Sequence, residues 1–161
     1  MKNPGKIFED DFRDSCPRDI YYLRLHDSSI GFDIKNSTQR FALKSPYDTI
    51  LCKNGQMYAI ELKSCGGTSF SYKGDNAYIK MRQVEELIKA KRAGAISYLV
   101  LNFRKYEKTY AIDPDDFVDF INATNKKSIN LRDVEILWSK ILIPQRLKKT
   151  RYKYDLGVLF I

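Results

Sequence analysis

The sequence predicts an α/β fold in which helices flank a small mixed β-sheet, built as one domain over residues 1–161. Two apolar segments joined by Asn54-Gly55 predict a β-hairpin, because this dipeptide accepts the positive φ angles of a two-residue turn. A nearly continuous apolar run at 95–103 predicts a strand buried on both faces. Helical patterns alternate with these strands along the chain, which is typical of layered α/β folds.

The first half of the chain predicts one helix and three strands. Residues 5–14 have the apolar spacing of a short amphipathic helix, which ends at Cys16-Pro17. Residues 20–25 are rich in aromatic and branched side chains and predict a strand, and the polar stretch 26–40 predicts a loop. The hairpin strands are expected at about 48–53 and 56–63, and the stretch 64–76, with three glycines, predicts a second loop.

The second half predicts two further helices and two strands. An apolar stripe over 77–93 predicts a helix that ends at Gly94. Strands follow at 95–103 and 108–112, and Asp113-Pro114 is a helix start for a segment that reaches about residue 122. Residues 131–137 predict a further short element, and a basic tail at 146–153 precedes an apolar run at 156–161 that we expect to pack.

The composition limits the function. Hydrophobic residues make up 43% of 161, which excludes global disorder. Three cysteines without a CxxC pair and a single histidine argue against a disulfide framework, a zinc knuckle and a histidine-rich metal site. No apolar run could span a membrane and no signal-peptide pattern is present, so we expect a cytoplasmic protein without a membrane partner.

The charge indicates a class of partner. Lys and Arg number 28 against 20 Asp and Glu, which gives a net charge of +8, and 11 Tyr and 9 Phe accompany them. This balance favours a polyanion, most simply nucleic acid. A basic but unspecialised surface is the alternative.

Three charged residues on the predicted hairpin are the main candidate for chemistry. Pairing about Asn54-Gly55 places Asp48 opposite Glu61, and strand alternation puts Lys63 on the same face as Glu61. Two opposed carboxylates repel each other unless a cation lies between them, and such oxygens suit Mg²⁺ together with a substrate phosphate. Lys63 could orient or activate an attacking water. The alternative is a solvated strand face with Asp48 as a turn residue.

These residues resemble a known family. Pro46-Tyr47-Asp48, followed after twelve residues by Glu61-Leu62-Lys63, is similar to the signature of the PD-(D/E)xK nucleases, with one residue inserted between Pro and Asp. The resemblance implies a restriction-endonuclease-like fold and metal-dependent cleavage of DNA phosphodiesters. It also implies that Glu9 adds an acidic group near the metal and that Gln83 is a supporting polar residue.

Further features extend the resemblance: the Gly-x-x-Phe-Glu pattern at 5–9, the aromatic strand at 21–25, the loop that contains 68–71, and the helix that carries Gln83. With these, the chain is most similar within that superfamily to RecU-type Holliday junction resolvases, over roughly residues 5–112. This resemblance implies cleavage of four-way junctions in recombination or repair, Mg²⁺ as cofactor with Mn²⁺ as a substitute, branched DNA as partner, and a homodimer. The segments 26–40 and 64–76 leave little room for a long junction-inserting stalk. Two alternatives are another PD-(D/E)xK endonuclease of the restriction or repair type, and a non-catalytic DNA-binding module of the same fold.

Further side chains are candidates for contact with DNA. Basic residues near the site could follow a phosphate backbone, although a solvated surface explains the outer ones equally well. Two aromatic residues of the 64–76 loop could insert at a junction centre, and His26 is expected to be an ordinary loop residue near the site. The candidates for DNA binding are Arg24, Lys73, Lys80, Arg82, Phe70 and Tyr72.

Overall fold

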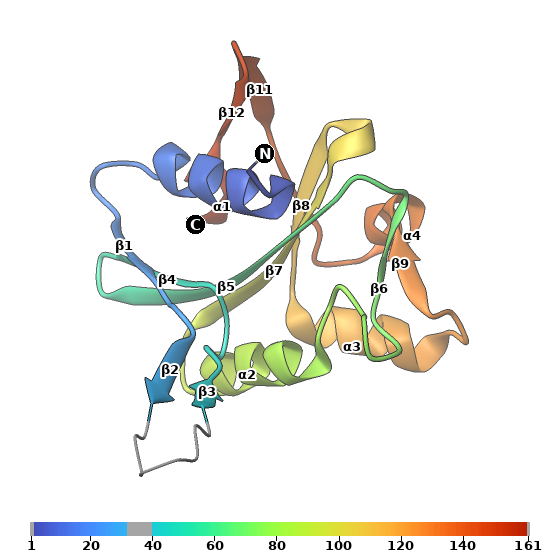
Figure 1. Cartoon of the computed structure of the whole chain (residues 1–161). Coiled ribbons are helices and arrows are strands. Elements are labelled where there is room, and N and C mark those ends of the chain that lie inside the picture. Colours follow the sequence, from blue (N-terminus) through green and yellow to red (C-terminus); the bar gives the residue numbers. More distant parts are fainter. Residues whose placement is uncertain (1, 32–39, 161) are drawn as a thin grey trace.

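The structure is a computed structural model that describes residues 2–31 and 40–160. Its central sheet has six strands in the order β1-β4-β5-β7-β8-β10 (Figure 1). β5 and β7 are parallel, and every other neighbouring pair in this sheet is antiparallel. This arrangement confirms the predicted α/β fold with a mixed central sheet. The strands are β1 (Tyr21–Arg24), β4 (Thr49–Lys53), β5 (Gln56–Cys65), β7 (Ile96–Phe103), β8 (Lys108–Ile112) and β10 (Ile141–Ile143).

Helices cover both faces of the sheet (Figure 1). On one face, α1 (Pro4–Ser15) packs through Phe8 and Phe12 into a core that includes Tyr58 and Ile60 of β5. On the other face, α2 (Met81–Arg92) and α3 (Pro114–Ala123) pack into a second core with Ala59. Because side chains alternate along a strand, the odd-numbered residues of β5 after Ala59 face the α2 side.

The β4–β5 hairpin has the predicted register. Lys53 pairs with Gln56 and Thr49 with Ile60, so paired positions sum to 109. Asn54 and Gly55 have φ angles of 50° and 79°, as a two-residue turn with both central residues left-handed requires. The turn chemistry therefore sets the pairing, and the pairing sets which residues of the two strands face each other.

The helices confirm the sequence patterns with small differences at their ends. In α3, the Asp113 side chain accepts a hydrogen bond from the Asp115 amide, and Pro114 occupies the first turn. α4 (Leu131–Ile136) forms at the predicted short element and begins with a capping box at Asn130. α2 begins four residues later than predicted, because Ile79 donates its amide to the Ser71 carbonyl and continues the preceding connection instead of a helix.

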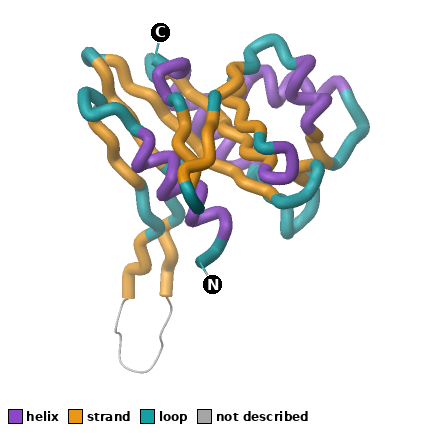
Figure 2. The backbone as a smooth tube through the Cα atoms, turned by 90° about the horizontal axis from the view of Figure 1, so that it is seen from above, coloured by secondary structure: helices purple, strands orange, loops and turns teal. Residues whose placement is uncertain are grey.

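Among the residues that the structure describes, three small ribbons lie outside the main sheet, and two of them correct the sequence prediction. Part of the predicted loop 26–40 forms β2 (Ser28–Gly31), which pairs with β3 (Arg40–Leu43), while 32–39 lie outside the described residues. Figure 2 shows these two paired strands projecting from the body of the molecule. The segment 64–76 contains the end of β5 and β6 (Ser69–Ser71), which pairs with β9 (Ser128–Asn130). The two corrections have different reasons. β6 has only three residues and pairs with a segment far away in the chain, whereas β2 carries one large apolar residue among serines and a glycine, too few for a strand pattern.

The C-terminal segment forms the third ribbon and a buried end. β11 (Gln145–Lys148) pairs with β12 (Arg151–Tyr154), and Figure 1 shows this ribbon projecting past α1. Leu156 and Leu159 of the following short helix (Leu156–Leu159) are buried, so the apolar tail packs as predicted. The short helix Arg104–Tyr106 joins β7 to β8. No helix in the described ranges is both long and apolar enough to cross a bilayer.

Candidate active site

The structure brings Asp48 and Glu61 together where β4 begins. The backbone of Asp48 extends the β1–β4 pairing, because its carbonyl accepts a hydrogen bond of 2.8 Å from the Leu25 amide. Its side chain turns toward β5, where Oδ2 accepts a 2.8 Å hydrogen bond from the Leu62 amide. The main chain of both strands therefore fixes the Asp48 carboxylate beside Glu61, and each carboxyl group alters the pKa of the other.

Glu61 is a buried carboxylate with few donors. Its side chain is only 1% exposed. Oε1 lies 2.5 Å from the Lys63 ammonium, but neither oxygen receives a hydrogen bond of normal geometry from any described residue. Burial, and then the negative charge of Asp48, raise the pKa of Glu61 to about 8. Burial also raises the pKa of Asp48. Such a pair is costly to hold without a compensating cation.

Lys63 is held between Glu61 and Gln83. Its Nζ donates a 3.0 Å hydrogen bond to Oε1 of Gln83, which lies on α2. Val84, the next residue of α2, is buried in the core beneath the sheet and fixes the position of this turn of the helix. The structure therefore brings the predicted supporting residue Gln83 into direct contact with the predicted lysine. The position of the Gln83 side chain fits a role in orienting the Lys63 ammonium.

Glu9 lies on α1 and forms an ion pair with Arg24 of β1. Burial, followed by the charge of Asp48, raises the pKa of Glu9, so the two carboxylates are near each other. Within the described part of the chain, however, no three His, Cys, Asp or Glu side chains are close enough together to hold a metal ion. Asp48 and Glu61 thus form the centre of the site, and a metal-binding role for Glu9 stays a prediction.

An open cleft of about 690 Å³ leads to this centre. Glu9, Asp48 and Gln83 line it, together with three of the basic residues that were predicted to bind DNA. Arg82 is fixed there by a 3.0 Å hydrogen bond from Nη2 to the Ser45 carbonyl. His26 also lines the cleft, as the expected loop residue near the site. The basic side chains along the cleft are Lys6, Arg24, Lys44, Lys80 and Arg82.

Sequence reasoning missed Lys6 and Lys44. Lys6 lies three residues before Glu9, on the same side of α1, and this helical spacing was a usable signal. Lys44 follows β3, whose pairing was not predicted, so no pattern placed it near the site.

Two predicted DNA contacts are wrong. Phe70 and Tyr72 are buried, not exposed for insertion into DNA. The Phe70 ring packs against Phe103 with centroids 4.9 Å apart, and the Tyr72 hydroxyl donates a 2.8 Å hydrogen bond to the Lys126 carbonyl. Pairing of β6 with β9 turns these aromatic side chains into the core. Lys73 is exposed but does not line the cleft.

The donor set at the centre fits a hard divalent cation. Two adjacent carboxylates supply oxygen ligands, and among the described residues the buried oxygens of Glu61 lack the donors that buried polar atoms normally have. A cation between them would offset the burial that raises the pKa of both carboxyl groups and the repulsion from Asp48 that raises the pKa of Glu61 further. The residues present therefore fit a divalent cation, and Asp48 and Glu61 are the carboxylates that would hold it.

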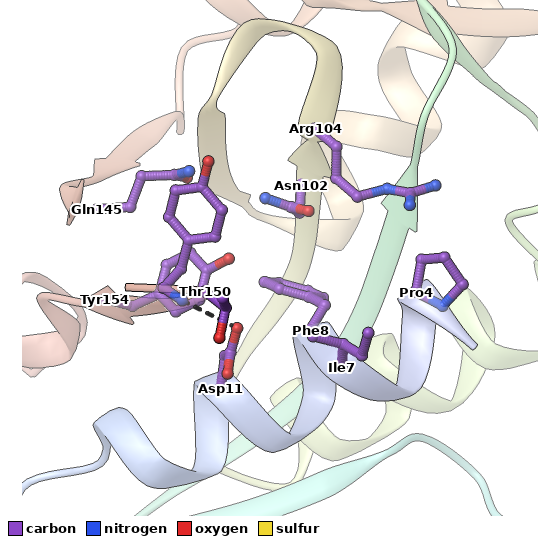
Figure 3. Close-up of a pocket in the computed structure, with 10 residues that line it drawn as sticks. Pro4, Ile7, Phe8, Asp11, Asn102, Arg104, Gln145, Thr150 and Tyr154 are labelled. Carbon is purple, nitrogen blue, oxygen red and sulfur yellow. Dashed lines mark hydrogen bonds between the residues drawn. The ribbon is translucent and has the colours of Figure 1, made fainter. Parts of the chain in front are cut away.

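A second concavity of about 280 Å³ lies on the opposite flank of α1 (Figure 3). Pro4, Ile7 and Phe8 of α1 form one wall and Tyr154 of β12 another. Asn102 at the end of β7 contributes a buried amide. Its walls are mainly apolar, and the described residues that line it include no pair of carboxylates, so it differs in chemistry from the cleft.

Comparison with known proteins identifies the family. Among solved structures, the Holliday junction resolvase Hjc of Archaeoglobus fulgidus is similar, with 16% identity and a TM-score of 0.48 over 80% of this chain and 88% of that one. No curated protein matches the chain significantly. The family model for Recombination protein U, RecU, matches residues 19–150. The match spans β1 to the β11–β12 turn and includes Asp48, Glu61 and Lys63, and the chain therefore belongs to the RecU family.

Proposed function

We propose that this protein is a Mg²⁺-dependent DNA endonuclease that cleaves four-way (Holliday) junctions in recombination or repair. The observation that carries the proposal is the Asp48–Glu61 pair, a half-buried and a fully buried carboxylate side by side, with an ammonium beside them at the end of a basic cleft. This is the donor set that phosphodiester hydrolysis needs. Membership in the RecU family and the resemblance of the motif support the same reaction.

Each residue of the centre has a definite task. Asp48 and Glu61 would hold the metal, and Glu9 would join them directly or through a water once Arg24 releases it. The bound cation supplies charge neutralisation at the phosphate and lowers the pKa of a coordinated water. Lys63, oriented by Gln83, presents its ammonium at the place where a water attacks and negative charge develops on the phosphate.

The cleft accounts for the substrate class. Lys6, Arg24, Lys44, Lys80 and Arg82 line an open, polar surface, and cations in such a surface contact phosphates without reading sequence. A four-way junction has twofold symmetry, and its resolution needs two cuts. A C₂ homodimer supplies two such clefts in matching orientation, so we propose that the active form is a dimer.

The test is cleavage of a labelled four-way junction beside a linear duplex of matched sequence, in Mg²⁺, in Mn²⁺ and in EDTA. Symmetric nicks on the junction that require the metal are the expected result. Lys63→Met should abolish the nicks and keep binding, because the methionine retains the length and the apolar stem but not the ammonium. A surface variant such as Lys105→Met serves as the matched control.

The other outcomes separate the alternatives. Equal cutting of junction and duplex would favour a restriction-type or repair endonuclease with the same centre. Tight binding without cutting of either substrate would favour a non-catalytic DNA-binding module. Cutting that persists in Asp48→Asn and Glu61→Gln would overturn the assignment of the centre itself.

A further inference from the structure

The β11–β12 ribbon carries its charges on one face. Its register pairs Arg146 with Lys153 and Lys148 with Arg151. Directly opposed residues of an antiparallel pair lie on the same side, as do alternate residues of one strand. All four cations therefore share one face of a two-stranded ribbon, and Lys149 lies in its turn. Leu147 and Tyr152 form a pair on the opposite face.

This arrangement costs stability unless something compensates it. Like charges placed directly opposite each other destabilise a β-ladder, and residues 145–154 contain no acidic side chain. The β12 cations have partners on α1: Arg151 is paired with Asp11, and Lys153 donates a 2.8 Å hydrogen bond to the Asp14 carbonyl. Arg146, Lys148 and Lys149 are exposed and form no ion pair with any described residue.

The ribbon is held firmly on α1. Asp11 points from the helix toward the ribbon, and its Oδ2 accepts a 3.1 Å hydrogen bond from the Tyr152 amide (Figure 3). The Tyr154 amide donates a 2.9 Å hydrogen bond to Ser15 Oγ, and Tyr154 itself is buried. These contacts anchor the base of the ribbon while its charged tip projects beyond the helix (Figure 1). The cations are thus presented in a fixed arrangement.

The ribbon and the cleft share α1. Lys6 and Glu9 on one side of this helix line the cleft, and Asp11 on another side holds the ribbon. A helix with its side chains is about 10–12 Å wide, which is less than the length of one turn of duplex DNA, about 34 Å. A duplex arm that leaves the cleft over α1 can therefore reach the ribbon.

We propose that the cationic face of the β11–β12 ribbon, with Lys149 at its tip, binds the phosphate backbone of a DNA arm outside the catalytic cleft. This inference rests on the proposed function, because DNA in the cleft is what brings an arm to the ribbon. The phosphates supply the negative charge that the ribbon lacks. The contact is independent of sequence, and it extends the bound length of the arm beyond the cut site.

The experiment compares two triple variants of the full chain. In the ribbon variant, Arg146→Gln and Lys148→Gln are combined with Lys149→Asn, because asparagine tolerates the positive φ of 56° at this position. The control variant carries Arg92→Gln, Lys127→Gln and Arg132→Gln, which remove the same charge from exposed residues around α2 and α4. Thermal unfolding checks that both variants fold as the wild type does.

Binding of a four-way junction is measured in EDTA as a function of salt. Removing one cation that binds a phosphate should lower the slope of log K against log salt by roughly 1. We expect the slope of the ribbon variant to fall by about two to three, and its affinity near 0.1 M salt to fall about tenfold or more, with the control variant close to wild type. Shortening the arms of the junction should lower the affinity of the wild type toward that of the ribbon variant, and should leave the affinity of the ribbon variant unchanged.

The outcomes distinguish this inference from the proposed function. If the wild type cuts junctions and both triple variants keep its salt slope and arm-length dependence, the ribbon inference is overturned and the nuclease stands. If the wild type cuts nothing but its DNA affinity depends on the ribbon, the ribbon inference stands and the nuclease is lost. If the wild type binds no DNA, both fail.

Discussion

Two buried carboxylates, Asp11 and Glu61, differ sharply in what surrounds them. Asp11 is 4% exposed and accepts hydrogen bonds from the Tyr152 amide and from Arg151, so its charge is compensated within the fold. Glu61 is 1% exposed, and among the described residues it forms an ion pair with Lys63 alone, with Asp48 adding repulsion. The first carboxylate holds two elements together. The second is left short of partners, as expected of a group that binds a cation during the reaction.

The largest effect should come from removing the charge at Glu61. Glu61→Gln keeps the shape but removes one anionic ligand, and cleavage of a four-way junction should fall by about 10³-fold or more, since a bound metal supplies several kcal/mol. Asp11→Asn, the matched change at the compensated carboxylate, should keep cleavage within a fewfold of wild type at a temperature where it is folded. Equal losses of cleavage in Glu61→Gln and Asp11→Asn would contradict the proposed difference between the two carboxylates.

Glu61 should also make the metal-free protein less stable at high pH. Its pKa is raised from 4.5 to about 8 in the folded protein, so the stability it contributes is complete below pH 4.5 and is lost as the pH rises to 8. The loss between pH 5 and 8 amounts to at most about 4 kcal/mol. Chemical unfolding in EDTA should show that the free energy of unfolding of Glu61→Gln rises relative to that of the wild type between pH 5 and 8. A difference in stability that stays constant with pH would contradict the conclusion that Glu61 is a buried carboxylate whose charge Lys63 compensates only in part.

Removing the compensated carboxylate should affect stability instead of chemistry. Asp11→Ala leaves the Tyr152 amide and the Arg151 guanidinium without their acceptor. The Arg151 side chain is 43% exposed, so water replaces part of that interaction. We expect a loss of about 2 kcal/mol in the free energy of unfolding, measured by urea denaturation, with junction cleavage retained below the midpoint. A variant as stable as wild type would mean that α1 and the ribbon are held by packing alone.

A smaller effect is expected at Gln83. Gln83→Leu removes the acceptor that lies 3.0 Å from Lys63 Nζ and leaves the ammonium less well placed. The cleavage rate at saturating DNA should fall by about tenfold, equivalent to roughly 1.4 kcal/mol, with DNA affinity unchanged. Gln83→Glu, which restores an acceptor, should recover part of the rate if positioning of Lys63 is the cause. A loss of affinity without loss of rate would assign Gln83 to DNA contact instead.

The smallest effect should come from Tyr72. Tyr72→Phe removes one hydrogen bond to the Lys126 carbonyl and should cost about 1 kcal/mol of stability. Because the ring lies in the core, affinity for a four-way junction should not change. A lower affinity for the junction at unchanged stability would indicate that Tyr72 contacts DNA after all.

The sequence was sufficient to predict that Asp48 and Glu61 lie side by side. Asn54-Gly55 specifies a two-residue turn, a two-residue turn specifies the register, and the register places Asp48 beside Glu61. Each of these steps depends on residues that are close together in the sequence, so turn propensity and strand periodicity are enough to predict it. Lys63 follows from alternation along the same strand. The long apolar strand β7 was predictable for a similar reason, because burial on both faces leaves a continuous pattern.

Contacts between distant segments could not be predicted. Phe70 and Tyr72 were expected to be exposed because they lie in a glycine-containing stretch, but pairing with residues near Ile129 buries them. The ion pair of Glu9 with Arg24 and the hold of Asp11 on Arg151 join residues that only the folded sheet brings together. The four cations on one ribbon face became apparent only with the β11–β12 register.

Metal binding to the protein without DNA tests the central claim most directly. Titration of Mn²⁺ at pH 8, with thermal unfolding as the readout, should raise the midpoint of the wild type progressively, because a ligand that binds only the folded state stabilises it. Asp11→Asn should respond in the same way, and Glu61→Gln should show little or no response. An equal rise for wild type and Glu61→Gln would contradict the account, since the metal would then bind without the carboxylate that the fold leaves short of partners.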